Sequence, residues 1–186
     1  LLEPAYDRAF DEIELGTQPL PAAQYETLIA LVESFLADRL YSRLKVVGLL
    51  LDLLARRGLA PGDASSLPRL SAPRLLLRHH DAGVRHANHR GDARAARTHA
   101  QQAHEQFRKI ARPTVADLRA YHELLNRSAG IHANEFAFER CLAELAEARR
   151  CEESVCEALT GGERPAPTSE ILGKIYGTSA QSLAFL

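Results

Sequence analysis

Residues 91–113 read GDARAARTHAQQAHEQFRKIARP, and this stretch decides the fold class. Its apolar positions recur at steps of three and four, which is the spacing of one face of an α-helix. Gly91 and Asp92 provide a break and an N-cap, and Pro113 ends the segment because the residue before a proline avoids helical geometry. We therefore predict a helix with a narrow buried stripe, rich in alanine, that lets a second helix approach closely. The stripe consists of Ala93, Ala96, Ala100, Ala103, Phe107 and Ile110.

The same helical period extends over most of the chain, in segments that come in pairs. We predict helical hairpins at about 22–58, 74–112 and 114–149. No segment has the alternating, β-branched pattern of a strand, and no break is a two-residue turn of the Asn-Gly kind. The sequence therefore predicts an all-α fold of antiparallel helix pairs, which form a short α-solenoid or an irregular helical bundle.

Proline, glycine and serine mark the joints between these helices. Residues 59–73 form the clearest linker, because proline and glycine interrupt helices and serine competes for backbone hydrogen bonds. We expect a turn near 38–42 within the first pair and a break at Gly130 within the third. Thr114 and Asp117 have the spacing of a capping box that opens the third pair.

The length and composition of the chain fit one ordinary folded domain. The chain has 186 residues, of which 46% are hydrophobic and 25% are charged, so it is too apolar for a disordered protein. We predict one helical domain over residues 1–160, with a short capping helix within 1–21, and a linker and C-terminal tail over 161–186. The start at Leu1 and the absence of Met are typical of a fragment or a processed chain.

Three stretches resemble known helical repeats. Tyr25-Glu-Thr-Leu-Ile and Tyr121-His-Glu-Leu-Leu are similar to the opening of a pentatricopeptide repeat, and Gly91-Asp-Ala-Arg-Ala-Ala is similar to the second helix of a tetratricopeptide unit. The resemblance implies stacked helical hairpins. Glu26 and His122 stand where the pentatricopeptide family reads a base with small polar side chains. The resemblance therefore implies the architecture and not base-specific readout of RNA.

Positive charge is concentrated in the middle of the chain. The formal net charge is −1, but residues 65–113 hold 10 basic and 3 acidic groups, whereas both flanking segments are acidic. One face of the predicted central helix carries an arginine row, and arginine side chains at this spacing can follow phosphates in RNA. A solvated face that pairs with the acidic flanks would give the same pattern. The row consists of Arg90, Arg94, Arg97 and Arg108, with His104 on the same side.

Histidines and cysteines give no metal-binding motif. Six of the eight histidines lie in residues 79–104, without a His-Glu-x-x-His or Glu-x-x-His pair, and His86 and His89 lack a local carboxylate or thiolate partner. We predict no metal site and no cofactor. Three cysteines without a close Cys-x-x-Cys doublet indicate buried thiols in a reducing intracellular compartment, of which an organellar matrix is one candidate. They are Cys141, Cys151 and Cys156.

The sequence contains no local signature of an enzyme and no segment long and apolar enough for a membrane span. We predict a non-catalytic helical scaffold that contacts other protein subunits of a larger assembly. A ribonucleoprotein is the leading candidate, with the arginine row on RNA backbone or on an acidic partner. One alternative is a protein–protein adaptor that docks through apolar faces such as Val46–Leu54 and has no nucleic-acid role. A second alternative is an all-α enzyme whose site is assembled from distant residues.

Overall fold

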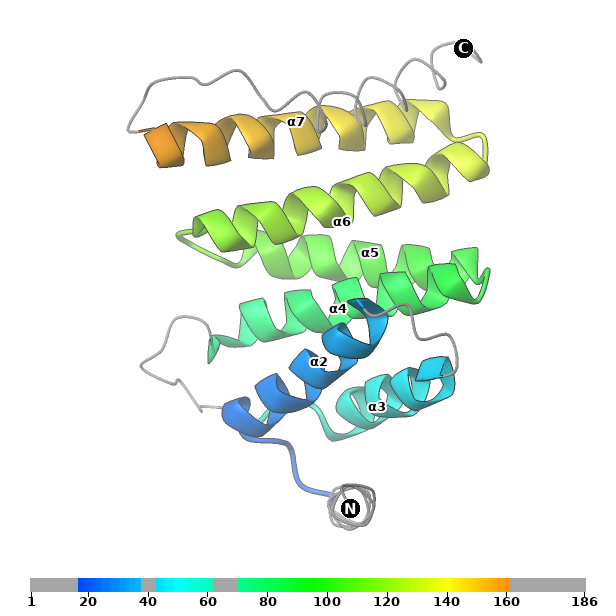
Figure 1. Ribbon diagram of the computed structural model, residues 1–186, viewed down its shortest axis with the longest axis vertical. Coiled ribbons are helices and arrows are strands. Elements are labelled where there is room, and N and C mark those ends of the chain that lie inside the picture. Colours follow the sequence, from blue (N-terminus) through cyan, green and yellow to red (C-terminus); the bar gives the residue numbers. More distant parts are fainter. Residues whose placement is uncertain (1–16, 38–42, 62–69, 161–186) are drawn as a thin grey trace. The chain divides into compact units, whose positions relative to one another are not determined.

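A computed structural model describes residues 17–37, 43–61 and 70–160 of the chain. These ranges are helical and contain no strand, which confirms the all-α prediction; their only β-type contact is an isolated bridge between Leu20 and Leu59. The expected capping helix within 1–21 and the expected tail lie largely or wholly outside the described residues. The helices are α2 (Ala22–Ala37), α3 (Leu44–Arg57), α4 (Ala72–His89), α5 (Ala93–Arg108), α6 (Val115–Asn134) and α7 (Phe138–Thr160) (Figure 1).

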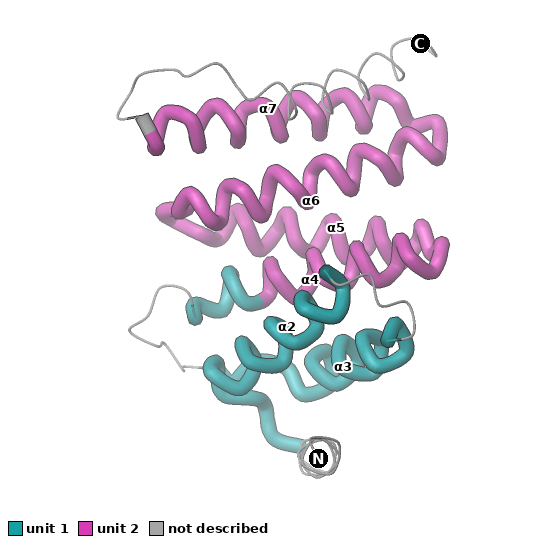
Figure 2. Tube along the Cα trace, in the orientation of Figure 1, with its two compact units in different colours: residues 1–75 teal, residues 76–186 magenta. Residues whose placement is uncertain are grey.

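The chain divides into two compact units, residues 1–75 and 76–186 (Figure 2). In the first unit α2 packs against α3, and the buried side chains come from one face of each helix, as their three-and-four spacing predicts. The backbone NH of Leu20 donates to the Gly58 carbonyl at 3.0 Å, and the NH of Ala60 donates to the Leu20 carbonyl at 2.9 Å. These bonds join the entry to α2 with the exit from α3. Gly58 has a φ of 67°, which glycine adopts without steric cost.

In the second unit α4, α5, α6 and α7 follow one another in alternating directions (Figure 1). Their packed side chains form a large apolar cluster, to which the alanine stripe contributes Ala96, Ala100 and Ala103, all buried. A smaller cluster of Ala129, Cys141 and Leu145 lies between α6 and α7. Ala93 is exposed, because it lies at the first position of α5, where no neighbouring helix covers it. Small side chains on α5 therefore face the core, as the sequence predicts, from Ala96 onward.

The predicted starts of α5 and α6 are confirmed in atomic detail. The Asp92 carboxylate accepts a hydrogen bond from the Ala95 backbone NH at 2.9 Å, so Asp92 is the N-cap of α5. Thr114 and Asp117 form the expected capping box of α6, in which each side chain accepts a hydrogen bond from the other residue's backbone NH.

Three predicted boundaries are wrong. Gly130 does not break a helix but lies inside α6, because one glycine costs a helix only about 1 kcal/mol and the buried neighbours outweigh it. The break falls instead around Phe136, whose φ is 58°. α5 ends at Arg108 rather than beside Pro113, and α4 begins at Ala72, inside the predicted linker, since a proline is tolerated in the first turn of a helix.

α2 and α3 are separate helices, as expected, although residues 38–42 between them lie outside the described residues. Cys141 and Cys151 are buried and Cys156 is partly buried, and all three are free thiols. In the described part of the chain, no helix combines the length and the apolar character that crossing a membrane requires.

Candidate nucleic-acid interface and the polar cluster beside it

α5 places three members of the arginine row, Arg94, Arg97 and Arg108, on one side, and Arg90 lies in the turn that precedes the helix. All four residues are exposed, as a phosphate-binding surface requires. The row lies beside the buried alanine stripe, because positions three and four apart recur on the same face. From Arg94 to Arg108 the helix rises about 21 Å, at roughly 1.5 Å per residue.

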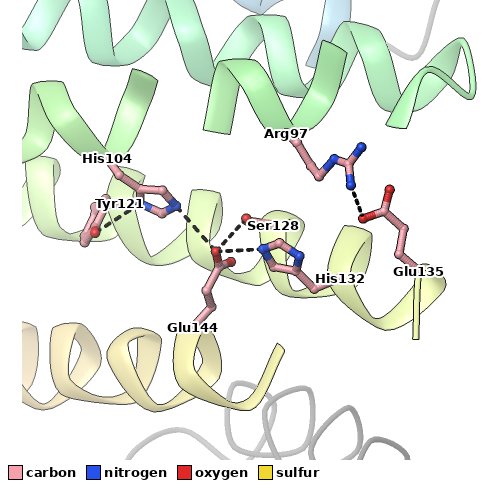
Figure 3. Close-up of polar contacts among 7 residues, drawn as sticks. All are labelled: Arg97, His104, Tyr121, Ser128, His132, Glu135 and Glu144. Atoms are coloured by element: carbon pink, nitrogen blue, oxygen red, sulfur yellow. Dashed lines mark hydrogen bonds and ion pairs between the residues drawn. The ribbon is translucent and has the colours of Figure 1, made fainter. Parts of the chain in front are cut away.

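The arginines of the row differ in their partners. Nη1 of Arg97 lies 2.9 Å from Oε2 of Glu135, at the end of α6, and the Arg97 side chain is still 47% exposed (Figure 3). Within the described ranges, no carboxylate forms an ion pair with Arg90, Arg94 or Arg108. The acidic side chains of the described ranges therefore leave these three guanidinium groups without an ion pair.

His104, which the sequence places on the same side as the row, turns toward the neighbouring helices instead. Its Nδ1 lies 3.1 Å from the Tyr121 hydroxyl of α6, and its Nε2 lies 3.6 Å from Oε1 of Glu144 on α7. Burial raises the pKa of Tyr121 to about 12, so the hydroxyl stays protonated and can donate to Nδ1. This arrangement leaves the Nε2 proton of a neutral His104 for Glu144.

Glu144 is the centre of a polar cluster that three helices build (Figure 3). Its Oε1 accepts a hydrogen bond from the Ser128 hydroxyl at 2.8 Å and lies 3.3 Å from Nε2 of His132. The second carboxylate oxygen, Oε2, and Nδ1 of His132 are buried and have no hydrogen-bond partner among the described residues. We call the five residues the Glu144 cluster; they are His104, Tyr121, Ser128, His132 and Glu144.

Two cavities lie on either side of the contact between His104 and Glu144. One has a volume of about 450 Å³ and is lined by residues of all three helices, among them Arg97, Arg108 and Arg140. The other has a volume of about 510 Å³ and is lined by Phe107, Tyr121 and other residues toward the start of α6. The first cavity therefore connects the arginine row to the Glu144 cluster, and its lining includes three arginines and the carboxylates of Glu105 and Glu144.

Sequence reasoning missed Tyr121, Ser128, His132 and Glu144 as members of one cluster. Glu144 has no local motif, and its partners lie on α5 and α6, so only the packing of the three helices brings them together. The one sequence signal is Ser128, a polar residue at a helix position that should face a neighbouring helix. In the structure Ser128 and the adjacent Ala129 are both buried.

A second group of histidines lies between α4 and α5 and consists of His79, His80 and His99. Nδ1 of His80 lies 3.4 Å from Nδ1 of His99, and the ring centroids of His79 and His80 are 5.0 Å apart. Burial, and then the neighbouring imidazoles, lower the pKa of His79 to about 3 and that of His80 to about 4. In the described ranges no group of three or more His, Cys, Asp or Glu side chains is placed to hold a metal ion.

The apolar segment Val46–Leu54, predicted by the adaptor alternative to dock a partner, is mostly core. Leu50 and Leu54 are fully buried in the first unit, and the exposed large side chain of this segment is Leu49, at 60%. Leu50 therefore cannot contact a partner unless the unit opens.

Comparison of the chain with protein-family models, with curated proteins and with solved structures gives no match.

Proposed function

We propose that this chain is a non-catalytic helical interaction protein that binds the phosphate backbone of RNA through the arginine row, as one component of a larger assembly. The observation that carries the proposal is the exposure of Arg90, Arg94 and Arg108 without an ion pair in the described residues. Guanidinium groups bind phosphate oxygens in a bidentate manner, and each phosphate contact releases counterions, so such a row contributes affinity and position but no sequence preference.

The fold favours this function over the adaptor alternative. The apolar surface that the adaptor needs on α3 is largely buried, whereas the cationic surface on α5 is open. The row also continues into a cavity rimmed by Arg97, Arg108 and Arg140, so a bound strand would meet positive charge on α5 and on α7.

A salt titration tests the proposal. We expect the protein to bind a fluorescent single-stranded RNA at low salt, with an affinity that falls as salt increases. Replacing Arg90, Arg94, Arg97 and Arg108 together by Gln should weaken binding and flatten the slope of log K against log salt by about 2 to 3, because each lost phosphate contact removes about 0.7 for single strands.

The matched control removes the same number of exposed arginines elsewhere, from Arg56, Arg119, Arg149 and Arg150. This variant should keep most of the affinity. If the two quadruple variants lose the same affinity, binding reflects net charge alone. If the parent protein does not bind RNA at low salt, the proposed function is wrong.

An all-α enzyme is the second candidate, and the Glu144 cluster is the observation that favours it. Tyr121, His104 and Glu144 form a chain of groups along which a proton can pass, and all three line the cavity of about 510 Å³. The reaction class that such groups serve is hydrolysis by general acid–base catalysis. A screen with activated carboxylic and phosphodiester substrates tests it: hydrolysis by the parent that Glu144→Gln abolishes would establish a reaction, and a rate equal to buffer for both would remove this candidate.

A further inference from the structure

Phe136 is the most exposed large apolar side chain of the described residues, at 75% of its full exposure. It lies in the turn between α6 and α7, and its φ of 58° falls in the left-handed region that aromatic residues seldom occupy. The Phe138 ring meets it edge to face, with 6.0 Å between the ring centroids. The backbone and Phe138 thus hold an aromatic face outward, in water, where it contributes little to the core.

The surroundings of Phe136 are charged rather than apolar. The preceding residue, Glu135, holds the Arg97 guanidinium at 2.9 Å, and both Arg97 and Arg140 line the cavity of about 450 Å³. Glu139, on the first turn of α7, is an exposed carboxylate. Arg94 lies one helical turn before Arg97 on the same face of α5. The ion pair between Glu135 and Arg97 therefore joins the turn that carries Phe136 to the arginine row.

We propose that Phe136 is a stacking platform for an unpaired base of a single-stranded nucleic acid whose phosphates lie along the arginine row. This inference rests on the proposed function and extends it from backbone contact to a preference for single strands. A rigid aromatic ring stacks on any base, because every base has a π-face, and a neighbouring row of cations holds the backbone.

An exposed aromatic ring with charged neighbours favours a nucleic acid over an apolar protein partner as the ligand of Phe136. An aromatic hot spot in a protein interface lies at the centre of an apolar patch, surrounded by contacts that exclude water. Phe136 instead follows Glu135, which pairs with Arg97 of the row, and precedes the charged Glu139 and Arg140 at the start of α7. The aromatic ring that contacts it is Phe138. A charged surrounding of this kind suits a ligand that alternates flat bases and phosphates.

Binding of three oligonucleotides separates the stacking contact from the phosphate contacts. The probes are a single-stranded RNA, the same strand in a duplex, and the same strand with abasic positions. We expect Phe136→Ala to weaken binding of the single strand by about 5- to 100-fold, the range of one lost stacking contact, with an unchanged salt slope. It should not alter binding of the duplex or of the abasic strand. Phe136→Trp, which keeps a π-face, should bind the single strand at least as tightly as the parent.

Leu159→Ala is the control for the loss of an exposed apolar side chain, because Leu159 is 59% exposed at the other end of α7. It should bind all three probes as the parent does, and equal melting temperatures establish that all variants are folded. If Phe136→Ala binds the single strand like the parent while the quadruple arginine variant does not, the stacking platform is refuted and the proposed function stands. If Phe136→Leu binds the single strand as tightly as Phe136→Trp, the contact needs no π-face and the stacking platform is refuted.

Discussion

Two groups of histidines lie against different sides of α5, and they differ in the charge that accompanies them. Between α4 and α5, His79, His80 and His99 pack against one another. Between α5, α6 and α7, His104 and His132 both lie beside the carboxylate of Glu144. One helix thus contributes His99 to a group of packed imidazoles and His104 to a group centred on the carboxylate of Glu144.

The difference shows how the same residue type stabilises two kinds of contact. In the first group burial lowers the pKa values, and the other imidazoles lower those of His79 and His80 further, so the rings are neutral at pH 7 and pack as aromatic side chains. In the second group the carboxylate accepts a hydrogen bond from the Ser128 hydroxyl, and Nε2 of His104 and of His132 lie 3.6 and 3.3 Å from its Oε1 atom. The α4–α5 contact is therefore built from neutral, packed rings, and the α5–α7 contact is built around a carboxylate.

Acid should destabilise the packing of His79, His80 and His99, and this is the largest loss of unfolding free energy that we expect. An unfolded histidine titrates near pH 6.5, whereas the pKa of folded His79 is about 3. As the pH falls below 6.5 the unfolded chain takes up protons that the folded chain does not, so the free energy of unfolding falls until the folded pKa values are reached. His79 alone should cost about 2 to 3 kcal/mol between about pH 6.5 and pH 4.5. Urea unfolding at a series of pH values measures this slope.

The control separates His79 from other groups that titrate in acid. His79→Gln should flatten the dependence of the unfolding free energy on pH in this window. His89→Gln, which removes an exposed histidine from the end of the same helix, tests whether any histidine would do the same. Equal slopes for the parent and for His79→Gln would show that the first group does not exclude protons, and the contrast between the two groups would be lost.

Removing the Glu144 carboxylate should disrupt the Glu144 cluster, with the next largest loss of unfolding free energy. Glu144→Ala leaves the buried Ser128 hydroxyl without its acceptor and removes the carboxylate 3.3 Å from the His132 imidazole, which should lower the free energy of unfolding by about 1 to 3 kcal/mol. Glu153→Ala is the matched control on α7, because its pair with Arg149 is largely exposed and should contribute about 0 to 1 kcal/mol. Equal losses in thermal melts would mean that Glu144 contributes no more than a surface ion pair.

The helices and their caps could be predicted from the sequence, because these features depend on neighbours in the chain. The three-and-four spacing located all six described helices, and Asp92 and Thr114 marked helix starts correctly. The errors arise because the prediction uses only neighbours in the chain. Glycine often ends helices, so Gly130 predicts a break, but burial of Ala129 and Ile131 keeps this segment helical. The function, the partners and the resemblance to helical repeats stay predictions.

The arginine row could be predicted from the sequence, but the contacts of His104 could not. The arginine row is predicted from helical spacing, and the structure places Arg94, Arg97 and Arg108 on an exposed face of α5, with Arg90 in the turn before it. The same spacing predicts His104 on the same side of the helix. Its side chain instead contacts Tyr121 and Glu144, which belong to other helices. A sequence without its tertiary packing does not reveal which polar position will be covered.

Replacing either of two glycines by alanine should change the stability least. The comparison of the two changes tests how closely α4 and α5 approach each other. A Cβ atom at Gly83 would lie 2.6 Å from two atoms of the His99 ring, whereas one at Gly130 would meet nothing within 4 Å. Both glycines lie inside helices, so each Gly→Ala change gains up to about 1 kcal/mol of helix propensity. Gly130→Ala should therefore stabilise the protein. Gly83→Ala should destabilise it by about 1 kcal/mol, because overpacking costs about 1 to 3 kcal/mol.

The His99→Ala background decides whether this loss comes from the first histidine group. With the ring gone, Gly83→Ala should become as stabilising as Gly130→Ala, since only the propensity gain remains. The double-mutant cycle is measured by urea unfolding at pH 7.5, where the histidines are neutral and the acid effect does not contribute. A Gly83→Ala change that stabilises the parent equally would mean that the His99 ring can move away at no cost. His79, His80 and His99 would then be a loose contact rather than a packed one, and the first group would be expected to admit protons more readily than its burial indicates.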